Sequence, residues 1–316
     1  KTYLLLADIL DWRWSEKKGC SKQYPSVEII RQFVLGDWDS VFEELNIRLQ
    51  RCLQLNNSSK YEQNVNAEDL DKYEKTAIDY FNKNEFVEAI RFFEKCEEID
   101  TSNERLINNL GLAYQKNNQL KAAEAKYKKA ILLKKDYLNP YLNLIDLYFH
   151  EENYNLVEKT INDAVEFFGL NNELIFCWGI LYHKLGKYDE AEKYYLALKN
   201  SNYENLDLDI NLGILYDKIG HHLKAANLFI EAIRKYPRQA ELYFHLGNIY
   251  TNFNESENAL EWYNKAIELN PHYIDAYLNI GSLLFNDRKI VEAKKLYEKM
   301  ISDGITDHRV YYSLAI

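Results

Sequence analysis

The sequence predicts an all-α protein, a solenoid built from stacked helical hairpins. Two observations lead to this prediction. Several residue types recur with one spacing of 34 residues, and the 316-residue chain contains only 11 glycines and 4 prolines. Scarce glycine and proline favour long helices joined by short turns. A repeat period of about 20–50 residues is typical of a stack of supersecondary units.

Four series of residues, which we name ladders, share this spacing without an insertion. The glycine ladder is Gly111, Gly179, Gly213, Gly247 and Gly281, with Ile145 at the intervening step. The alanine ladder is Ala89, Ala123, Val157, Ala191, Ala225, Ala259 and Ala293. The first aromatic ladder is Tyr80, Tyr114, Tyr148, Tyr182, Tyr216, Tyr250 and Leu284. The second aromatic ladder is Phe93, Tyr127, Ile161, Tyr195, Phe229, Tyr263 and Tyr297.

The order of residue types within one period resembles the tetratricopeptide repeat (TPR). The segment Tyr243–Pro271, YFHLGNIYTNFNESENALEWYNKAIELNP, follows the family pattern along its whole length. The resemblance implies an all-α, right-handed superhelical solenoid of TPR helical hairpins and covers about three quarters of the chain. We place seven repeats at 70–103, 104–137, 138–171, 172–205, 206–239, 240–273 and 274–307.

Each repeat reads as two amphipathic helices, because its apolar residues recur at spacings of three and four. Glycine or alanine allows two helices to approach closely, and an aromatic ring fills the space beside them. We therefore expect the ladder residues to meet between neighbouring hairpins. A single hairpin cannot bury its apolar face alone, so neighbours must stack.

Turn residues divide the two helices of a repeat. Gly186, Gly220 and Asn254 tolerate the backbone angles of a short turn between the first helix and the second. Pro237 and Pro271 follow the second helix of their repeats, where the chain must leave the helical path.

The third repeat is the least regular. It has Ile145 in place of glycine, Val157 in place of alanine and Phe167-Phe168-Gly169 at its end. We expect this repeat to pack less closely than the others, or to bend the array locally.

The N-terminal residues 1–69 do not keep the register, and we predict an irregular helical segment there. Tyr3–Trp14 reads as a short helix, and Pro25-Ser26 begins another with Ser26 as its N-cap. Gly36-Asp37-Trp38 turns into a third helix that runs to about Leu55, which makes a degenerate hairpin. The polar stretch Asn56–Asp69 is the predicted linker.

At the C-terminus, residues 308–316 match the first helix of an eighth repeat. Tyr311, Leu314 and Ala315 stand at its aromatic, apolar and small positions. A terminal repeat normally presents a polar outer face, and VYYSLAI is not polar. The pattern indicates a fragment of a longer protein, and the start at Lys1 leaves open the prior removal of a targeting segment.

Composition narrows the class of function. A net charge of -10 opposes a general nucleic-acid role and adhesion to an anionic membrane. The four cysteines, which form no CxxC pair, fit reduced thiols in a cytoplasmic protein. We expect protein or peptide partners, no nucleic acid or membrane, no cofactor and no metal.

The sequence carries no catalytic motif of the P-loop, GxGxxG, GxSxG or HExxH type. His221-His222, at a turn, has no acidic or cysteine partner at ligand spacing and reads as a solvated pair. Cys96 stands at a position that alanine holds in other repeats, which indicates buried packing. A stand-alone helical enzyme is therefore the weakest reading.

The first helices are expected to line a concave groove, as the TPR resemblance implies. Two residues before the glycine ladder runs an asparagine ladder that contains Asn109, Asn143, Asn211 and Asn279. It resembles the repeats of O-linked N-acetylglucosamine transferase, in which such asparagines grip the backbone of a bound peptide. Asparagine is common at this position in TPRs generally, so a purely structural role stays open. Asn248 beside Gly247 completes the amide set.

Five residues beyond the glycine ladder, Lys116, Lys184 and Lys218 place positive charge in the expected groove. A negatively charged or phosphorylated segment would be steered there, with an ordinary solvated face as the equal alternative.

An apolar series lies three residues before the glycine ladder: Leu142, Phe176, Ile210, Phe244 and Leu278. A further series, one residue after that ladder, is Leu112, Ile180 and Ile214. Part of both series packs between first helices, and any excess marks a binding surface.

These patterns favour a protein–protein interaction scaffold that binds peptide or helical segments in its groove. The alternative is the substrate-recognition arm of a larger enzyme, such as a protein glycosyltransferase, with further domains in the same parent chain. No repeat combines the basic residue and the asparagine of the two-carboxylate clamp, so binding of chaperone C-terminal tails is not expected.

Overall fold

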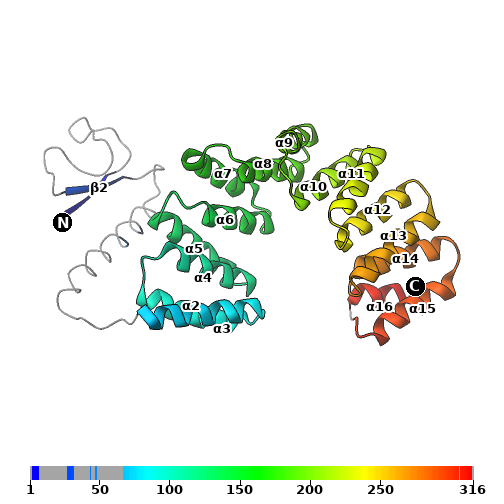
Figure 1. Cartoon of the computed structure of the whole chain (residues 1–316), viewed down its shortest axis with the longest axis horizontal. Coiled ribbons are helices and arrows are strands. Elements are labelled where there is room, and N and C mark those ends of the chain that lie inside the picture. Colours follow the sequence, from blue (N-terminus) through cyan, green and yellow to red (C-terminus); the bar gives the residue numbers. More distant parts are fainter. Residues whose placement is uncertain are drawn as a thin grey trace. The chain divides into compact units, whose positions relative to one another are not determined.

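The computed structural model describes residues 2–6, 27–31, 43, 47, 67–305 and 307–314, and Figure 1 shows their arrangement. Helices α2–α16 confirm the all-α fold class for the repeat region. The helices of the first four repeats are α2 (Ala67–Asn82), α3 (Phe86–Ile99), α4 (Glu104–Lys116), α5 (Leu120–Leu133), α6 (Leu138–His150), α7 (Tyr154–Phe168), α8 (Asn172–Lys184) and α9 (Tyr188–Asn200). The remaining helices are α10 (Leu206–Lys218), α11 (His222–Lys235), α12 (Ala240–Asn252), α13 (Ser256–Leu269), α14 (Ile274–Asn286), α15 (Ile290–Ser302) and α16 (His308–Leu314).

The chain divides into two compact units, Lys1–Leu156 and Val157–Ile316. In the first unit, α4 contacts its hairpin partner α5 and also α6, the first helix of the next hairpin. In the second unit, α10 contacts α11 and also α8 and α12. Within each unit, these first helices therefore lie against first helices of neighbouring hairpins, as expected for stacked hairpins.

The N-terminal prediction of helices is wrong where the structure describes it. Thr2–Leu6 forms strand β1 and Val27–Arg31 forms strand β2, and the two pair in parallel with Thr2 opposite Val27. Both segments are short apolar runs, for which periodicity cannot separate a strand from a helix. The predicted N-cap Ser26 lies outside the described residues. In the predicted third helix Glu43 and Ile47 are helical, and the rest of that segment lies outside the described residues.

The turn inside every repeat contains one residue in the left-handed region of the backbone. These residues are Asn84, Asn118, Glu152, Gly186, Gly220, Asn254 and Arg288, with φ between 55° and 81°. They are spaced by 34 residues, so the turn obeys the same period as the ladders. Glycine and asparagine accept this conformation readily. The predicted turn residues Gly186, Gly220 and Asn254 are thus confirmed.

In every hairpin that has a ladder glycine, the glycine meets the second aromatic ladder inside the hairpin, and not between neighbouring hairpins as we expected from the sequence. A Cβ atom added to Gly111 would lie 2.7 Å from the Tyr127 ring, and one added to Gly247 would lie 2.5 Å from the Tyr263 ring. The aromatic residue stands 16 positions after the glycine, on the second helix of the same repeat. The ring therefore rests directly on the backbone of the first helix, where no side chain fits.

The other ladder residues form the core between these helices. The alanine ladder is completely buried apart from Ala293, which is 5% exposed. In the first repeat Ala77 occupies the glycine position and packs in one cluster with Phe93. Alanine recurs at these positions because the two helices are packed closely there and leave little room for a larger side chain.

The third repeat combines two changes of bulk. Ile145 stands at the glycine position and Ile161, in place of an aromatic residue, at the position that faces glycine in other repeats. Both are buried, with 1% and 0% exposure. The division between the two units falls within α7 of this repeat. The expected bend there stays a prediction.

Adding a methyl group at Gly247 tests the contact between glycine and aromatic ring. Gly247→Ala should lower the free energy of unfolding by about 2 kcal/mol, because the buried Tyr263 ring must move aside. Ser282→Ala, at an exposed position of α14, is the control and should leave stability within about 0.5 kcal/mol of wild type. Urea unfolding followed by circular dichroism measures both. Equal stability of the two variants would contradict the contact.

Candidate functional site

The predicted site residues lie on the first helices of the hairpins. Asn109, Asn143, Asn211, Asn248 and Asn279 are half-buried. The lysines of the set, Lys116, Lys184 and Lys218, are exposed at the C-terminal ends of α4, α8 and α10. The two kinds of residue therefore have different environments, and their neighbours decide what each can bind.

In the first unit, polar side chains tie α4 to α6. Asn143 Nδ2 donates a hydrogen bond of 2.9 Å to Asn108 Oδ1. Gln115 donates to Asp146 at 2.8 Å and accepts from the Tyr127 hydroxyl at 2.6 Å. The hydroxyl of the aromatic ladder thus joins a polar contact between two neighbouring hairpins.

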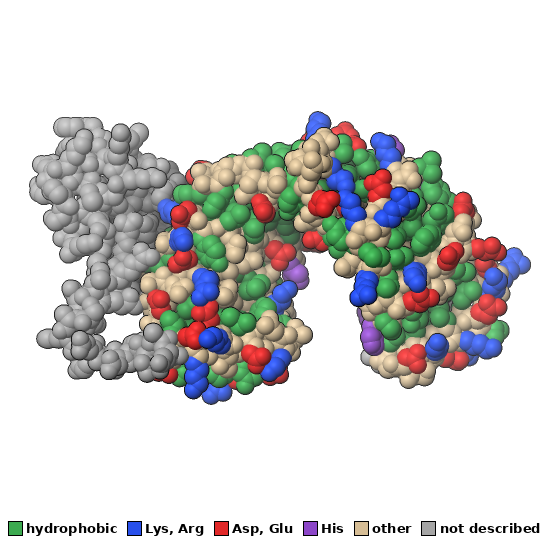
Figure 2. Space-filling view, viewed as in Figure 1, with side chains coloured by type: hydrophobic (Ala, Val, Ile, Leu, Met, Phe, Trp, Pro, Cys, Tyr) green, Lys and Arg blue, Asp and Glu red, His purple; other side chains and the backbone are tan. Residues whose placement is uncertain are grey.

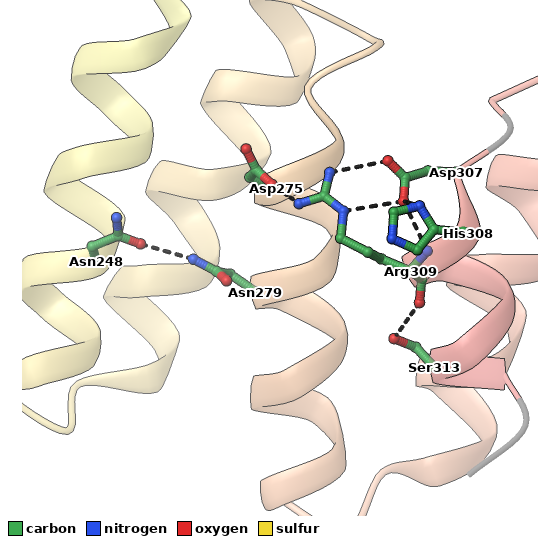
Figure 3. Close-up of polar contacts among 7 residues, drawn as sticks. All are labelled: Asn248, Asp275, Asn279, Asp307, His308, Arg309 and Ser313. Atoms are coloured by element: carbon green, nitrogen blue, oxygen red, sulfur yellow. Dashed lines mark hydrogen bonds and ion pairs between the residues drawn. The ribbon is translucent and has the colours of Figure 1, made fainter. Parts of the chain in front are cut away.

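In the second unit, a similar network joins α12 to α14 (Figure 3). Asn279 Nδ2 donates to Asn248 Oδ1 at 2.8 Å. The Tyr263 hydroxyl donates to Asn248 Oδ1 at 2.7 Å and lies 3.2 Å from Asn279 Nδ2. Asn143 and Asn279 thus use amide hydrogens to hold adjacent hairpins together. The sequence left this structural role open, since a ladder alone does not reveal the partner of its side chains.

Asn211 makes no such tie among the described residues. Its Nδ2 donates to the backbone oxygen of Asp207, one turn earlier in α10, at 2.8 Å. That carbonyl lies in the same helix, so this amide side chain remains on its own first helix.

The positive charges of Lys184 and Lys218 both act on His183 in the second unit. Neither forms an ion pair with a described residue, and Lys218 Nζ lies 5.5 Å from the centre of the Tyr188 ring. The His183 ring lies 6.0 Å from the same tyrosine, edge to face. Burial first, and then the charges of Lys218 and Lys184, lower the pKa of His183 to about 4. Positive potential therefore collects around a histidine that is neutral at physiological pH. Lys116 belongs to the other unit.

Many other basic side chains are matched by acids. Glu97 receives both Lys126 and Lys129, at 2.5 and 2.8 Å, and these lysines lower the pKa of Glu97 although burial acts against them. Arg309 bonds Asp275 and Asp307 at 2.6 and 3.0 Å (Figure 3). Figure 2 shows acidic and basic side chains interspersed over the visible face, with hydrophobic side chains between them.

The predicted apolar series is partly buried between first helices. Phe244 packs against Tyr273, with 5.0 Å between the ring centres, and Ile210 is only 5% exposed. The most exposed large apolar residues lie instead at the starts of second helices: Val87 (65%), Leu223 (72%), Ile290 (58%) and Val291 (68%). An apolar binding strip along the first helices is therefore not a feature of the described surface.

The histidine and cysteine predictions have mixed outcomes. His222 has an acidic partner that the sequence analysis did not recognise, because Asp217 lies across the turn with Oδ1 2.6 Å from His222 Nδ1. Cys96 is buried, and burial raises the pKa of its thiol to about 11, so it stays protonated and unreactive.

The described residues offer neither a metal site nor a membrane-spanning helix. No group of three or more His, Cys, Asp or Glu side chains among them could hold a metal ion. No helix within the same part of the chain has the length and apolarity needed to cross a bilayer.

Comparisons with known proteins agree with the hairpin geometry. Three family models described as tetratricopeptide repeat match residues 104–137, 179–209 and 240–273. The first and last of these ranges coincide with the second and sixth repeats placed from the ladders. Among curated proteins no match was found.

Several solved structures share the fold. A tetratricopeptide repeat protein from Parabacteroides merdae is 18% identical over 79% of this chain and 98% of its own, with a TM-score of 0.62. The APC/C hetero-tetramer Cut9-Hcn1 contains a chain 17% identical over 69% of this chain and 43% of its own, with a TM-score of 0.59. PilF of Pseudomonas aeruginosa is 16% identical over 66% of this chain and 95% of its own, with a TM-score of 0.53.

Two tyrosines at equivalent ladder positions provide a matched test of the polar network. Tyr263→Phe should cost about 1–2 kcal/mol of unfolding free energy, because it removes a hydroxyl bonded to Asn248 and Thr251. The hydroxyl of Tyr195 is buried without a partner. Tyr195→Phe should therefore be neutral or stabilising by about 0.5–1 kcal/mol. Urea unfolding of both variants decides; an equal loss from both would exclude the network as the cause.

The environment of His183 predicts a pH dependence. Its pKa falls from the ordinary 6.5 to about 4 on folding, so the unfolded chain takes up the proton first as the pH falls. The stability due to neutral His183 is complete above about pH 6.5 and is lost progressively toward about pH 4.

Between about pH 7 and about pH 4.5, wild type should therefore lose about 1–2 kcal/mol more unfolding free energy than His183→Gln, after allowance for partial exposure. The exposed His272→Gln serves as control and should follow wild type. Parallel pH profiles for wild type and His183→Gln would refute the effect.

Proposed function

The chain is a tetratricopeptide repeat protein, and from that premise we propose that it is a non-catalytic interaction scaffold for an extended, acidic segment of a partner protein. The segment would lie along the first helices, with its acidic groups between α8 and α10. Lys184 and Lys218 would attract those groups, and the asparagine ladder would contact the backbone of the segment.

The observation that carries the proposal is the unpaired charge of the two lysines. The chain has a net charge of -10, and carboxylates pair with basic side chains along much of its length. Lys184 and Lys218 nevertheless form no ion pair with a described carboxylate, and both lower the pKa of His183. A partner's acidic groups would be attracted by the positive potential of these two lysines, which favours binding of an anion over binding of a cation.

The amide side chains suit the backbone of such a segment. Asn211 Nδ2 is held only by the Asp207 carbonyl of its own helix, so turning it outward exposes little unsatisfied polarity. An amide donates and accepts at once and does not discriminate between guest side chains. Asn109 lies at the matching step of α4, and Asn143 retains a second amide hydrogen beyond the one given to Asn108.

Several features support a scaffold over an enzyme. The buried thiol of Cys96 stays protonated, and among the described residues the neighbours of His183 are lysines and tyrosines, with no acid that forms a catalytic pair with it. The similar solenoid in Cut9-Hcn1 is part of a hetero-tetramer, which fits an assembly role for this fold. No observation favours the alternative of a glycosyltransferase arm.

Peptide binding tests the proposal directly. A fluorescent peptide with alternating glutamate and serine should bind wild type, and Lys184→Ala with Lys218→Ala should weaken the affinity about fivefold to tenfold, as expected for two partly exposed ion pairs. The binding constant should also fall as salt rises. Fluorescence anisotropy gives each value.

The control removes the same charge from second helices, through Lys265→Ala and Lys294→Ala on α13 and α15. This variant should bind like wild type. An equal loss in both double variants would reduce the effect to net charge, and unchanged affinity in the first would exclude the site.

A further inference from the structure

The junction between the fourth and fifth hairpins, formed by α9 and α10, departs from the repeat pattern. At the next two junctions of the second unit, α11–α12 and α13–α14, the last turn of the second helix carries isoleucine and the first turn of the following helix carries tyrosine. The equivalent pairs are Ile233 with Tyr243 and Ile267 with Tyr277. At the α9–α10 junction the same two positions hold Lys199 and Asp209.

These two residues form an ion pair in which Asp209 is buried and Lys199 is half-buried. Lys199 Nζ donates to Asp209 Oδ1 at 2.7 Å, and the two side chains are 30% and 6% exposed, respectively. Asp209 loses most of its hydration on packing and Lys199 loses part of it, and their attraction only partly restores the lost free energy. By contrast, Ile233 packs against the apolar cluster that contains Tyr243. The ion pair stabilises the packing of α9 on α10 less than an apolar pair would, because the two ions are hydrated again when the helices separate.

The neighbouring positions also differ. Leu198 stands where Ala130, Ala164, Ala232 and Ala266 stand in other repeats, and it is completely buried. The connection to α10 turns through Asn202 with a φ of 55°, whereas α11 and α13 end in Tyr236 and Asn270 with negative φ. The backbone thus enters the fifth hairpin by a different path, around a larger side chain.

The hydrogen bonds that Tyr263 and Asn279 make between first helices are not repeated by Tyr195 and Asn211 at this junction. The Tyr195 hydroxyl is buried without a hydrogen-bond partner, while the equivalent hydroxyl of Tyr263 joins Asn248 and Asn279. Asn211, at the step that Asn279 holds two repeats later, bonds its own helix. A buried unpaired hydroxyl is a cost that opening to water removes.

From these contacts we propose that the α9–α10 junction is a built-in joint, at which the stack of the second unit opens more readily than at the α11–α12 or α13–α14 junctions. Opening there hydrates Lys199, Asp209 and the Tyr195 hydroxyl, so it costs less free energy than exposing an apolar pair. Opening at the other junctions exposes isoleucine and tyrosine, which water does not compensate.

Hydrogen exchange of the native chain, followed by mass spectrometry, measures opening at each junction. Amides of α9 and α10 should exchange at least about tenfold faster than those of α12 and α13, since they open through a less costly local transition. Exchange of α9 and α10 as slow as that of α12 and α13 would overturn the joint, and this comparison needs no variant.

A double variant that introduces an apolar pair at the α9–α10 junction provides the second part of the test. Lys199→Ile with Asp209→Tyr copies the α11–α12 junction and should slow exchange in α9 and α10 about tenfold, with α13 unchanged. Lys265→Ile with Glu268→Tyr makes the same chemical change at an exposed ion pair of α13 and should leave α9 and α10 as in wild type. No slowing in the first variant, or equal slowing in both, would overturn the proposal.

Discussion

The contact between a glycine of the first helix and an aromatic ring of the second determines the geometry of the hairpins. At Gly247 the Tyr263 ring occupies the space that a Cβ would need. The helices can therefore approach closely only where a side chain is absent, and the ring fills the gap that remains. In the repeats that carry this glycine, one missing atom thus controls the distance between the two helices of the hairpin.

The same ring connects hairpin packing to the candidate site. Tyr127 and Tyr263 extend their hydroxyls to polar residues between first helices, where Gln115 and Asn248 receive them. Core packing thus orients the amides on the face proposed for the guest. Where the ladder carries phenylalanine, as at Phe229, the ring still fills the gap but supplies no hydroxyl. Close packing of the two helices therefore needs only the ring. The hydrogen bond from the ring hydroxyl is an additional contact, which some repeats have and others lack.

The sequence predicts features that obey the period and misses those that depend on a partner in space. The positions of the hairpins, the buried alanines and the turn at Gly220 were predictable, because each of these positions restricts the residue type that can occupy it. The contact of Gly247 with its own hairpin was not, since periodicity does not reveal what a position faces. Val27–Arg31 was read as the start of a helix, because a short apolar run outside the period lacks the alternation that identifies a strand. The Asp217–His222 pair crosses a turn and leaves no spacing signal.

Two features that depart from the repeat pattern lie in the fourth and fifth hairpins. The regular positions must satisfy packing with both neighbours, so they have little freedom to serve another purpose. Lys184 and Lys218 lie on the first helices of these two hairpins, and the ion pair Lys199–Asp209 lies between the hairpins. A separation of α9 from α10 would change the distance between the two lysines, so a guest that bridges them would favour one state of the joint. That coupling rests on the proposed function, whereas the joint rests only on its own buried contacts. On these two proposals, the weak stacking of α9 on α10 would allow a bound guest to influence the geometry of its own site.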